Sequence, residues 1–168
     1  GLHQVDASQV FVGAVDAVQV LAGNVHEVGQ AGAGAGIGEA IALGMAAEGA
    51  IVATSDIDEQ AAQRTARKAG EKGVRSIAIA ADCGDVASID AMVARTVAEL
   101  GRLDIIVNNA GYTWDATIQK MSEKQFDDIM DVHLKAPWRI LKEASEIIRI
   151  KSKEEAQKGE RVMRKVVN

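Results

Sequence analysis

The fold of this chain depends on one glycine-rich stretch, Gly32-Ala33-Gly34-Ala35-Gly36-Ile37-Gly38. Four glycines in seven residues disfavour the interior of a helix or strand, because glycine loses more backbone entropy on ordering than any other residue. The stretch suits a tight turn in which the backbone comes close to a ligand. A helix that starts at the end of this turn presents unpaired N–H groups and the positive end of its dipole, which favours a pyrophosphate.

The residues after the turn have helical spacing. Ile37, Ile41 and Met45 fall on one face of a predicted helix, and we expect the small residues Ala40 and Gly44 beside them to allow close packing on a sheet.

Further along the chain, strand-type and helical stretches alternate. The expected strands are 50–54, 74–81 and 103–107, and the expected helices between them are 59–69, capped by Asp58, and a helix capped by Ser88 and stopped by Gly101.

This β-α-β order with short connections predicts an α/β fold with a Rossmann-type, doubly wound parallel sheet in three α-β-α layers. Residues 1–30 are less informative: one or two short strands are expected there, but the segment 25–30 is too polar for a buried parallel strand. We therefore divide the chain into an N-terminal segment, 1–30, without assigned structure, and a dinucleotide-binding portion, 31–168, of a single domain.

The last third of the chain is expected to be mostly helical. Ser122 and Gln125 form a capping-box pattern that opens a long helix over about 123–148, and Pro137 should bend it. The Lys/Glu-rich run 151–161 is interpreted as a solvated face or a mobile loop. The final residues have the pattern of an opening fifth strand, which makes the predicted sheet incomplete at its C-terminal side.

Composition excludes several classes of protein. The 168 residues are 48% hydrophobic and carry a net charge of −5, which favours one globular domain and argues against nucleic acid or an anionic membrane as the main partner. The chain has one cysteine, Cys83, so it forms no internal disulfide and suits a reducing cytoplasm. No apolar run is long enough to span a membrane. His3 and His26 do not cluster with other ligands, so no metal site is expected.

Taken together, the motifs resemble the short-chain dehydrogenase/reductase family. The resemblance rests on Gly32-x-x-x-Gly36-Ile37-Gly38, on Asp56 and Asp82 after two of the strands, and on the run Asn108-Asn109-Ala110-Gly111. The chain is most similar to 3-oxoacyl-acyl-carrier-protein reductases, and the similarity extends from about residue 31 to the last residue. The resemblance implies cofactor contacts at Gly32, Gly34, Gly36, Ile37, Gly38, Asp56, Ile57, Asp82, Cys83, Asn108, Ala110 and Gly111.

The nature of the cofactor follows from Asp56. This residue lies about 20 residues after the glycine-rich turn, where a carboxylate can accept hydrogen bonds from both hydroxyls of the adenosine ribose. The same carboxylate would repel a 2′-phosphate, so NAD(H) is favoured over NADP(H). The alternative is that Asp56 only shapes the turn into the next helix, next to Asp58.

Four other residues at the strand ends have competing interpretations. By resemblance, Asp82 contacts the adenine amino group together with the Cys83 backbone, but an aspartate at this position can equally be a turn former. The Cys83 thiol is expected to be buried and not a nucleophile. Asn108 is interpreted as lining the cofactor site and Asn109 as mainly structural, with turn chemistry as the alternative for both.

The catalytic residues of the family are largely missing. The position that usually holds a catalytic asparagine is His133, whose imidazole can donate and accept a hydrogen bond in its place, or can be a helix histidine with a satisfied hydrogen bond. The family's serine and Tyr-x-x-x-Lys pair normally lie beyond the stretch present here, and the only tyrosine, Tyr112, is followed four residues later by Ala116. We therefore expect no turnover from this chain alone.

Two functions remain open at this point. The first is an NAD(H)-dependent oxidoreductase that interconverts a secondary alcohol and a ketone, present here as its cofactor-binding portion. The alternative is a non-catalytic dinucleotide-binding or oligomerisation module. The resemblance implies a small-molecule carbonyl or alcohol substrate and a homo-oligomer, dimer or tetramer, that packs through the long helix.

Overall fold

The computed structural model describes residues 18–21, 36–160 and 162–168. Within them, five parallel strands form one sheet in the order β3-β2-β1-β4-β5. The strands are β1 (Val18–Leu21), β2 (Val52–Asp56), β3 (Ser76–Ala80), β4 (Ile105–Asn108) and β5 (Lys165–Val167). From β1 at the centre of the sheet, the order winds outward first to one side and then to the other, which confirms the predicted doubly wound topology.

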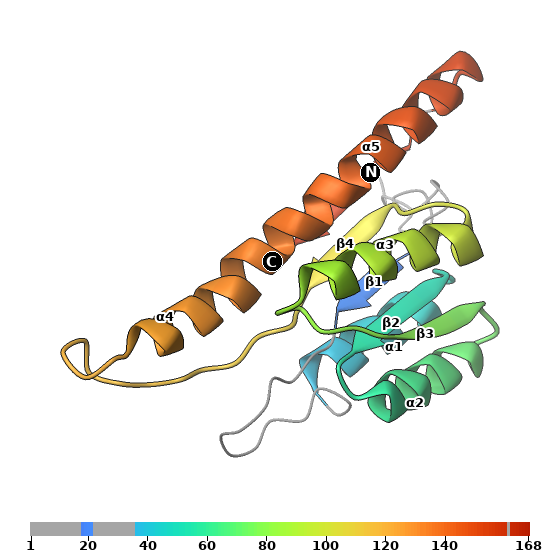
Figure 1. Cartoon of the computed structure of the whole chain (residues 1–168). Coiled ribbons are helices and arrows are strands. Elements are labelled where there is room, and N and C mark those ends of the chain that lie inside the picture. Colours follow the sequence, from blue (N-terminus) through green and yellow to red (C-terminus); the bar gives the residue numbers. More distant parts are fainter. Residues whose placement is uncertain (1–17, 22–35, 161) are drawn as a thin grey trace, which may run out of the picture.

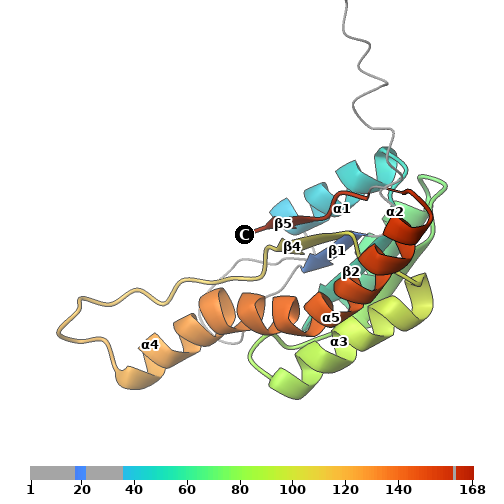
Figure 2. The ribbon, with the colours of Figure 1, turned by 90° about the horizontal axis from the view of Figure 1, so that it is seen from above.

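Four helices cover the two faces of the sheet (Figures 1 and 2). The helices α1 (Ile37–Ala47) and α2 (Glu59–Gly70) lie on one face, and α3 (Val86–Leu100) and α5 (Ala136–Gln157) lie on the other. The faces follow from strand alternation: in β4, Ile105 and Val107 pack with α1 and α2, whereas Ile106 packs with α3 and α5. The three-layer arrangement predicted from the sequence is confirmed.

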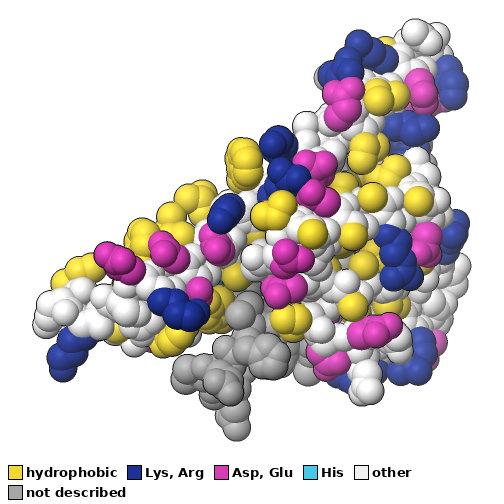
Figure 3. All heavy atoms as spheres, in the orientation of Figure 1, with side chains coloured by type: hydrophobic (Ala, Val, Ile, Leu, Met, Phe, Trp, Pro, Cys, Tyr) yellow, Lys and Arg dark blue, Asp and Glu magenta, His cyan; other side chains and the backbone are white. Residues whose placement is uncertain are grey.

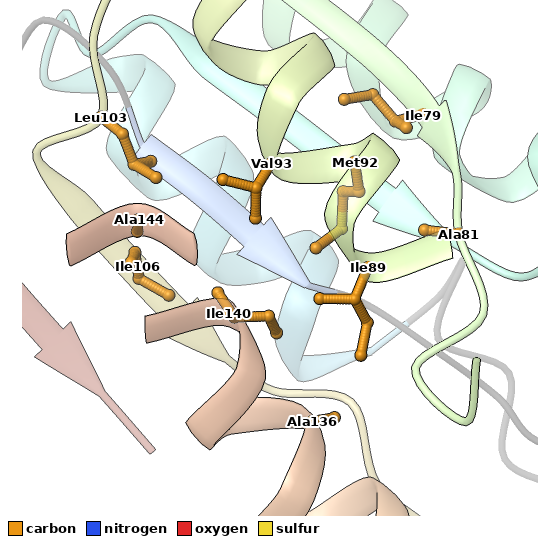
Figure 4. Close-up of a cluster of buried hydrophobic side chains, with 10 residues drawn as sticks. All are labelled: Ile79, Ala81, Ile89, Met92, Val93, Leu103, Ile106, Ala136, Ile140 and Ala144. Carbon is orange, nitrogen blue, oxygen red and sulfur yellow. The ribbon is translucent and has the colours of Figure 1, made fainter. Parts of the chain in front are cut away.

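The larger of the two cores lies between the sheet and the helices α3 and α5. Figure 4 shows its ten buried side chains converging from both helices and from the strands. Met92, Ile106 and Ile140 are among the largest fully buried side chains of the described residues, one from each of the three elements that meet there. This core fixes α5 against the sheet and therefore fixes the start of α5 near the end of β4.

The central strand β1 lies within the segment 1–30. It pairs with β2 on one side and β4 on the other, with Val18 opposite both Val52 and Ile105. One of the short strands expected in this segment is therefore present, and it is the strand at which the sheet order reverses. The polar segment 25–30, together with Gly32 and Gly34, lies outside the described residues.

The packed face of α1 differs from the prediction. The buried residues are Gly38, Ala42 and Ala46, whereas Ile37 is 74% exposed. Small side chains at every fourth position let the helix axis come close to the sheet, so the larger Ile41 and Met45 lie half-buried beside this face. The expectation that Ala40 and Gly44 provide the close packing was wrong, since both are exposed.

The cap of α3 also differs. The N-cap is Asp85, whose carboxylate accepts a hydrogen bond of 2.9 Å from the Ser88 N–H. Ser88 lies inside the first turn, and its Oγ accepts the Asp82 N–H at 2.9 Å. The helix ends as expected at Gly101, which has the left-handed conformation with φ 81°.

The long C-terminal helix has a wide turn in its middle. The capping box at Ser122 and Gln125 opens α4 (Glu123–Met130), a π-helical turn η2 (Asp131–Lys135) follows, and α5 continues to Gln157. The Ala136 N–H donates to Asp131 O, five residues back. This turn lies directly before Pro137, which has no N–H to donate to an α-helical ladder, so the predicted bend takes the form of a π turn.

The end of the chain completes one more strand pair. The charged run 151–161 continues α5 to Gln157 and is mostly exposed, so it is a solvated helix face and not a loop for most of its length. The chain then returns as β5, which pairs with β4 in parallel, with Val166 opposite Ile106. The expected opening of a fifth strand is confirmed, and among the described residues β5 forms this edge of the sheet.

Candidate functional site

The carboxyl ends of the strands form one edge of the sheet, where the candidate residues gather. Leu21 at the end of β1 is paired with Ser55 and Asn108, and Asp56 is paired with Ala80. Because α1 ends at the amino end of β2, its own start with Gly36 lies at this same edge. The topology therefore brings the start of α1 together with the ends of β2, β3 and β4, at the point where the strand order reverses.

Asp56 is buried at the end of β2. Its Oδ1 accepts the Asp58 N–H at 2.9 Å, and its main-chain carbonyl accepts the Ala81 N–H at 2.9 Å. The cap of α2 is Asp58, whose own carboxylate accepts the Gln60 N–H. Asp56 thus does not cap the helix, although one of its oxygens supports the turn that leads into it.

Asp82 and Cys83 follow the end of β3. The Asp82 Oδ1 accepts the Gly84 N–H at 2.7 Å, which is the hydrogen bond of an Asx turn. Burial, together with the negative charges of Asp82 and Asp56, raises the pKa of the Cys83 thiol from its ordinary 9.0 to about 11. The thiol is therefore protonated at neutral pH, which suits a packed side chain and not a nucleophile.

Asn108 ends β4 and contacts the last residue of the chain. Its Nδ2 donates a hydrogen bond of 2.6 Å to the Oδ1 of Asn168. Its own Oδ1 is buried and has no hydrogen-bond partner within residues 18–21, 36–160 and 162–168. Asn108 thus ties two neighbouring strand ends together, and it leaves one buried acceptor at the carboxyl edge.

His133 packs against the loop that leaves β4. Its Nε2 lies 2.8 Å from Tyr112 O and 3.2 Å from Tyr112 N, so the imidazole donates to the carbonyl in one tautomer and accepts from the N–H in the other. A Cβ on Gly111 would lie only 2.5 Å from His133 Cε1. The ring therefore occupies the space that a side chain at position 111 would need. His133 is exposed and lies in the π turn η2, a feature that often marks functional sites.

Most of the residues implied by the resemblance come together at this edge. They are Gly36, Ile37 and Gly38 at the start of α1, Asp56 and Ile57 after β2, Asp82 and Cys83 after β3, and Asn108, Ala110 and Gly111 after β4. Gly32 and Gly34 lie outside the described residues. Sequence reasoning missed Asn168, which holds Asn108, and it assigned Ser88 only as a helix cap, whereas its hydroxyl holds Asp82. The position of Asn168 directly after a strand was the signal that could have identified it.

The described residues of this edge fit a dinucleotide. The helix α1 begins at Gly36 without a side-chain cap, so its first N–H groups have no acceptor within the helix. The buried Asn108 Oδ1 can accept a hydrogen bond from a bound group, and Asp56 supplies a carboxylate at the end of β2, on the other side of β1. Donors for a phosphate and acceptors for hydroxyl or amino groups are thus present at one edge.

Other kinds of site have less support in the described parts of the chain. These parts contain no group of three or more His, Cys, Asp or Glu residues that could hold a metal ion. None of the helices described is long and apolar enough to cross a membrane.

Comparison with known proteins identifies the family. The sequence profile described as short chain dehydrogenase matches residues 28–160. This match covers most of the chain and agrees with the sheet order and the strand-end residues. The chain belongs to the short-chain dehydrogenase family, a family of oxidoreductases with a Rossmann fold.

Its relatives include a reductase and a dehydrogenase named for acyl substrates. The 3-oxoacyl-acyl-carrier-protein reductase FabG of Staphylococcus aureus is 37% identical over 115 residues, which are 68% of this chain and 47% of that protein. A hydroxyacyl-CoA dehydrogenase of Mycobacterium tuberculosis is 35% identical over 142 residues, 82% of this chain and 44% of its relative. The chain thus spans about half the length of the curated relatives that it matches.

Similar solved structures contain both kinds of nicotinamide cofactor. The alcohol dehydrogenase of the archaeon Thermococcus sibiricus, in complex with 5-hydroxy-NADP, has a TM-score of 0.68 and 25% identity, covering 78% of this chain and 52% of that one. An NAD⁺-bound xylitol dehydrogenase has a TM-score of 0.67 and 26% identity, covering 79% and 47%. These likenesses support a nicotinamide dinucleotide as the cofactor class.

Proposed function

We propose that this chain is the NAD(H)-binding portion of an oxidoreductase that interconverts a secondary alcohol and a ketone. The observation that carries the proposal is the meeting of Asp56, Asn108 and the uncapped start of α1 at the point where the strand order reverses. The names of the relatives, a 3-oxoacyl reductase and a hydroxyacyl-CoA dehydrogenase, favour a 3-oxoacyl or 3-hydroxyacyl group as the substrate class.

Each residue of the edge has a distinct part in this proposal. The N–H groups at the start of α1 bind the pyrophosphate, the Asp56 carboxylate accepts from the ribose hydroxyls, and the Asn108 Oδ1 accepts from the cofactor at the end of β4. The Asp82 carboxylate has two roles in this proposal. It accepts the Gly84 N–H and so shapes the turn, and it also lines the adenine pocket. The bound nicotinamide ring supplies the hydride chemistry.

Asp56 is also the basis for proposing NAD(H) over NADP(H), and calorimetric titration tests it. We expect the wild-type chain to bind NADH more tightly than NADPH, because a buried carboxylate repels a 2′-phosphate. Asp56→Asn keeps the shape of the side chain and removes its charge. This change should weaken NADH binding by about tenfold or more, the usual cost of losing a charged hydrogen-bond acceptor, and should narrow the gap to NADPH.

The matched control is Asp58→Asn, the same change two residues away. Asn is as good an N-cap as Asp, so α2 stays capped and NADH affinity should be unchanged. Equal loss of affinity in both variants would contradict a specific role for Asp56. Failure of the wild-type chain to bind either nucleotide would overturn the proposed function as a whole.

The alternative function is a non-catalytic dinucleotide-binding or oligomerisation module. The sequence has a single tyrosine, Tyr112, with Ala116 where the family's Tyr-x-x-x-Lys motif needs lysine. We therefore expect the 168-residue chain to bind NADH without oxidising it in the presence of a 3-oxoacyl substrate. Steady NADH oxidation by the purified chain would contradict this expectation and favour the complete enzyme.

We also propose that the chain forms a homo-oligomer through α4 and α5. Phe126, Leu134 and Trp138 recur at multiples of four residues and are 54%, 59% and 56% exposed. Figure 3 shows hydrophobic side chains along the outer edge of this helix, away from the sheet. Phe126 also lines a shallow groove at the start of α4 together with Ile118 and Met121. An apolar stripe of this kind is typical of a protein–protein interface.

A further inference from the structure

A cluster of four charged side chains lies at the other edge of the sheet, where β4 and β5 begin. Arg102 and Asp104 come from the segment before β4, Glu155 from the last turns of α5, and Arg164 from the residue before β5. The cluster therefore joins three elements that are separated in sequence. Neither the candidate site nor the proposed function uses it.

Arg164 is at the centre of this cluster. Its Nη1 and Nη2 donate to the two carboxylate oxygens of Glu155 at 3.0 and 2.8 Å, and its Nε lies 3.5 Å from the Asp104 Oδ1. The Asp104 side chain is only 1% exposed and also receives two hydrogen bonds from Arg102, at 2.6 and 3.0 Å. Arg164 Nη1 makes a further bond of 3.0 Å to the Ser152 hydroxyl.

The strand that follows Arg164 has few other contacts to hold it. β5 has three residues, and both of its valines, Val166 and Val167, are about half exposed. Among the described residues it pairs with β4, and the Lys165 N–H donates to Asp104 O, just before β4, at 3.0 Å. A short, exposed edge strand gains little from apolar burial, so the anchor at its start has a large share in its docking.

The carboxyl end of β5 places Asn168 at the candidate site. Asn168 Oδ1 accepts from Asn108 Nδ2 at 2.6 Å, which sets the orientation of the Asn108 amide and turns the buried Oδ1 away from β5. Only Lys165–Val167 separate Arg164 from Asn168. A shift of register at the start of β5 would therefore also displace Asn168 from Asn108.

We propose that Arg164 is a positioning residue: its hydrogen bonds to Glu155 and its ion pair with Asp104 dock β5 and thereby hold Asn168 against Asn108. The cluster at the amino end of the strands thus sets the geometry of an acceptor at their carboxyl ends. This inference extends the proposed cofactor site, and its effect on nucleotide affinity rests on that proposed function. The docking of β5 by Arg164 does not depend on the proposed function.

Hydrogen exchange of the whole chain, followed by mass spectrometry, tests the docking. Arg164→Met keeps the aliphatic stem and removes the guanidinium. In this variant we expect peptides covering residues 164–168 to exchange about tenfold faster or more, while peptides from β2 are unchanged, because local opening of β5 becomes easier. The control is Arg149→Met, which breaks an exposed ion pair with Glu146 on α5 and should leave β5 unchanged.

A second readout is NADH affinity. Asn168→Ala removes the contact to Asn108 without touching the cluster, so it should weaken NADH binding several-fold without altering exchange at Lys165. Arg164→Met should weaken binding to a similar extent. If exchange rises in Arg164→Met but NADH affinity is unchanged in both variants, positioning of the site is overturned.

The two proposals fail in different ways. If the wild-type chain binds no nucleotide, the proposed function fails and the exchange data alone decide whether Arg164 docks β5. Arg164→Lys covers the case of a variant that does not fold, since lysine keeps the charge but lacks the planar fork that contacts both carboxylates. We expect it to increase exchange less than Arg164→Met. If residues 164–168 exchange at the wild-type rate in folded Arg164→Met or folded Arg164→Lys, the inference is overturned.

Discussion

At the residue scale, the pair of Gly111 and His133 shows how one position limits another. Gly111 has no unusual backbone requirement in this structure, yet a Cβ there would collide with the imidazole at 2.5 Å. The imidazole in turn contacts the main chain of Tyr112. The absence of a side chain at position 111 therefore allows His133 to hold the loop that follows β4, next to Asn108.

We predict that Gly111→Ala destabilises the chain by about 1–3 kcal/mol, the usual cost of overpacking, because the His133 ring must leave its place against Tyr112. Urea denaturation measures the loss. His133→Ala empties the space that the new methyl group needs. In that background Gly111→Ala should cost close to nothing, which gives a coupling energy of similar size. Additive effects of the two changes would contradict the steric explanation.

At the element scale, α5 is stabilised at its C-terminal end by Glu155. Hydrogen bonds from Arg164 lower the pKa of the Glu155 carboxyl below its ordinary 4.5, and the positive charges of Arg164, Arg102 and Lys151 lower it further. A pKa that is lower in the folded chain means that the pair stabilises the fold above the unfolded pKa. This contribution is lost as the pH falls through the folded pKa.

We therefore predict that Glu155→Gln lowers the free energy of unfolding by about 1–3 kcal/mol at pH 7, since it leaves Arg164 without its charged acceptor. The difference from wild type should shrink as the pH falls below the unfolded pKa of about 4.5 and through the lower folded pKa, where the wild-type carboxyl takes up its proton. Urea midpoints between pH 7 and 3 measure this.

Glu146→Gln provides the comparison on the same helix. Arg149 also lowers the pKa of Glu146, but both side chains are more than half exposed, so solvent screens their attraction. The effect of Glu146→Gln on the urea midpoint should therefore be much smaller at every pH. A difference between Glu155→Gln and wild type that does not depend on pH would show that the ion pair is not its source.

Elements also differ in how well their ends could be predicted. The capping box at Ser122 and the left-handed Gly101 were found from sequence alone, because each depends on residues within one turn. The cap of α3 was misassigned to Ser88. Both Asp85 and Ser88 are residue types that suit a cap. The Ser88 hydroxyl instead accepts a hydrogen bond from the Asp82 N–H, and the Asp85 carboxylate caps the helix.

At the scale of the whole molecule, the helix formed by α4, η2 and α5 exposes an apolar stripe that a folded monomer would leave in water. We predict that the wild-type chain associates through Phe126, Leu134 and Trp138, and that Trp138→Glu dissociates the assembly. A buried tryptophan at such an interface contributes about 2 kcal/mol or more, so the dissociation constant should rise by about thirtyfold or more.

Size-exclusion chromatography with light scattering measures the change. The control is Val86→Glu, which places the same charge on an exposed apolar residue of α3, outside the stripe. It should leave the assembly intact. A monomeric wild-type chain at high concentration, or equal dissociation by both variants, would contradict an interface at this helix.

The sequence by itself determined the order of strands and helices and the family, because apolar periodicity, caps and glycine turns are local signals that each element carries within its own residues. Tertiary structure alone decided four other features. These are the position of β1, the face that α1 packs, the bond between Asn108 and Asn168, and the burial of Glu155. Each depends on how closely and in which register two distant segments meet, and no pattern within one segment contains that information.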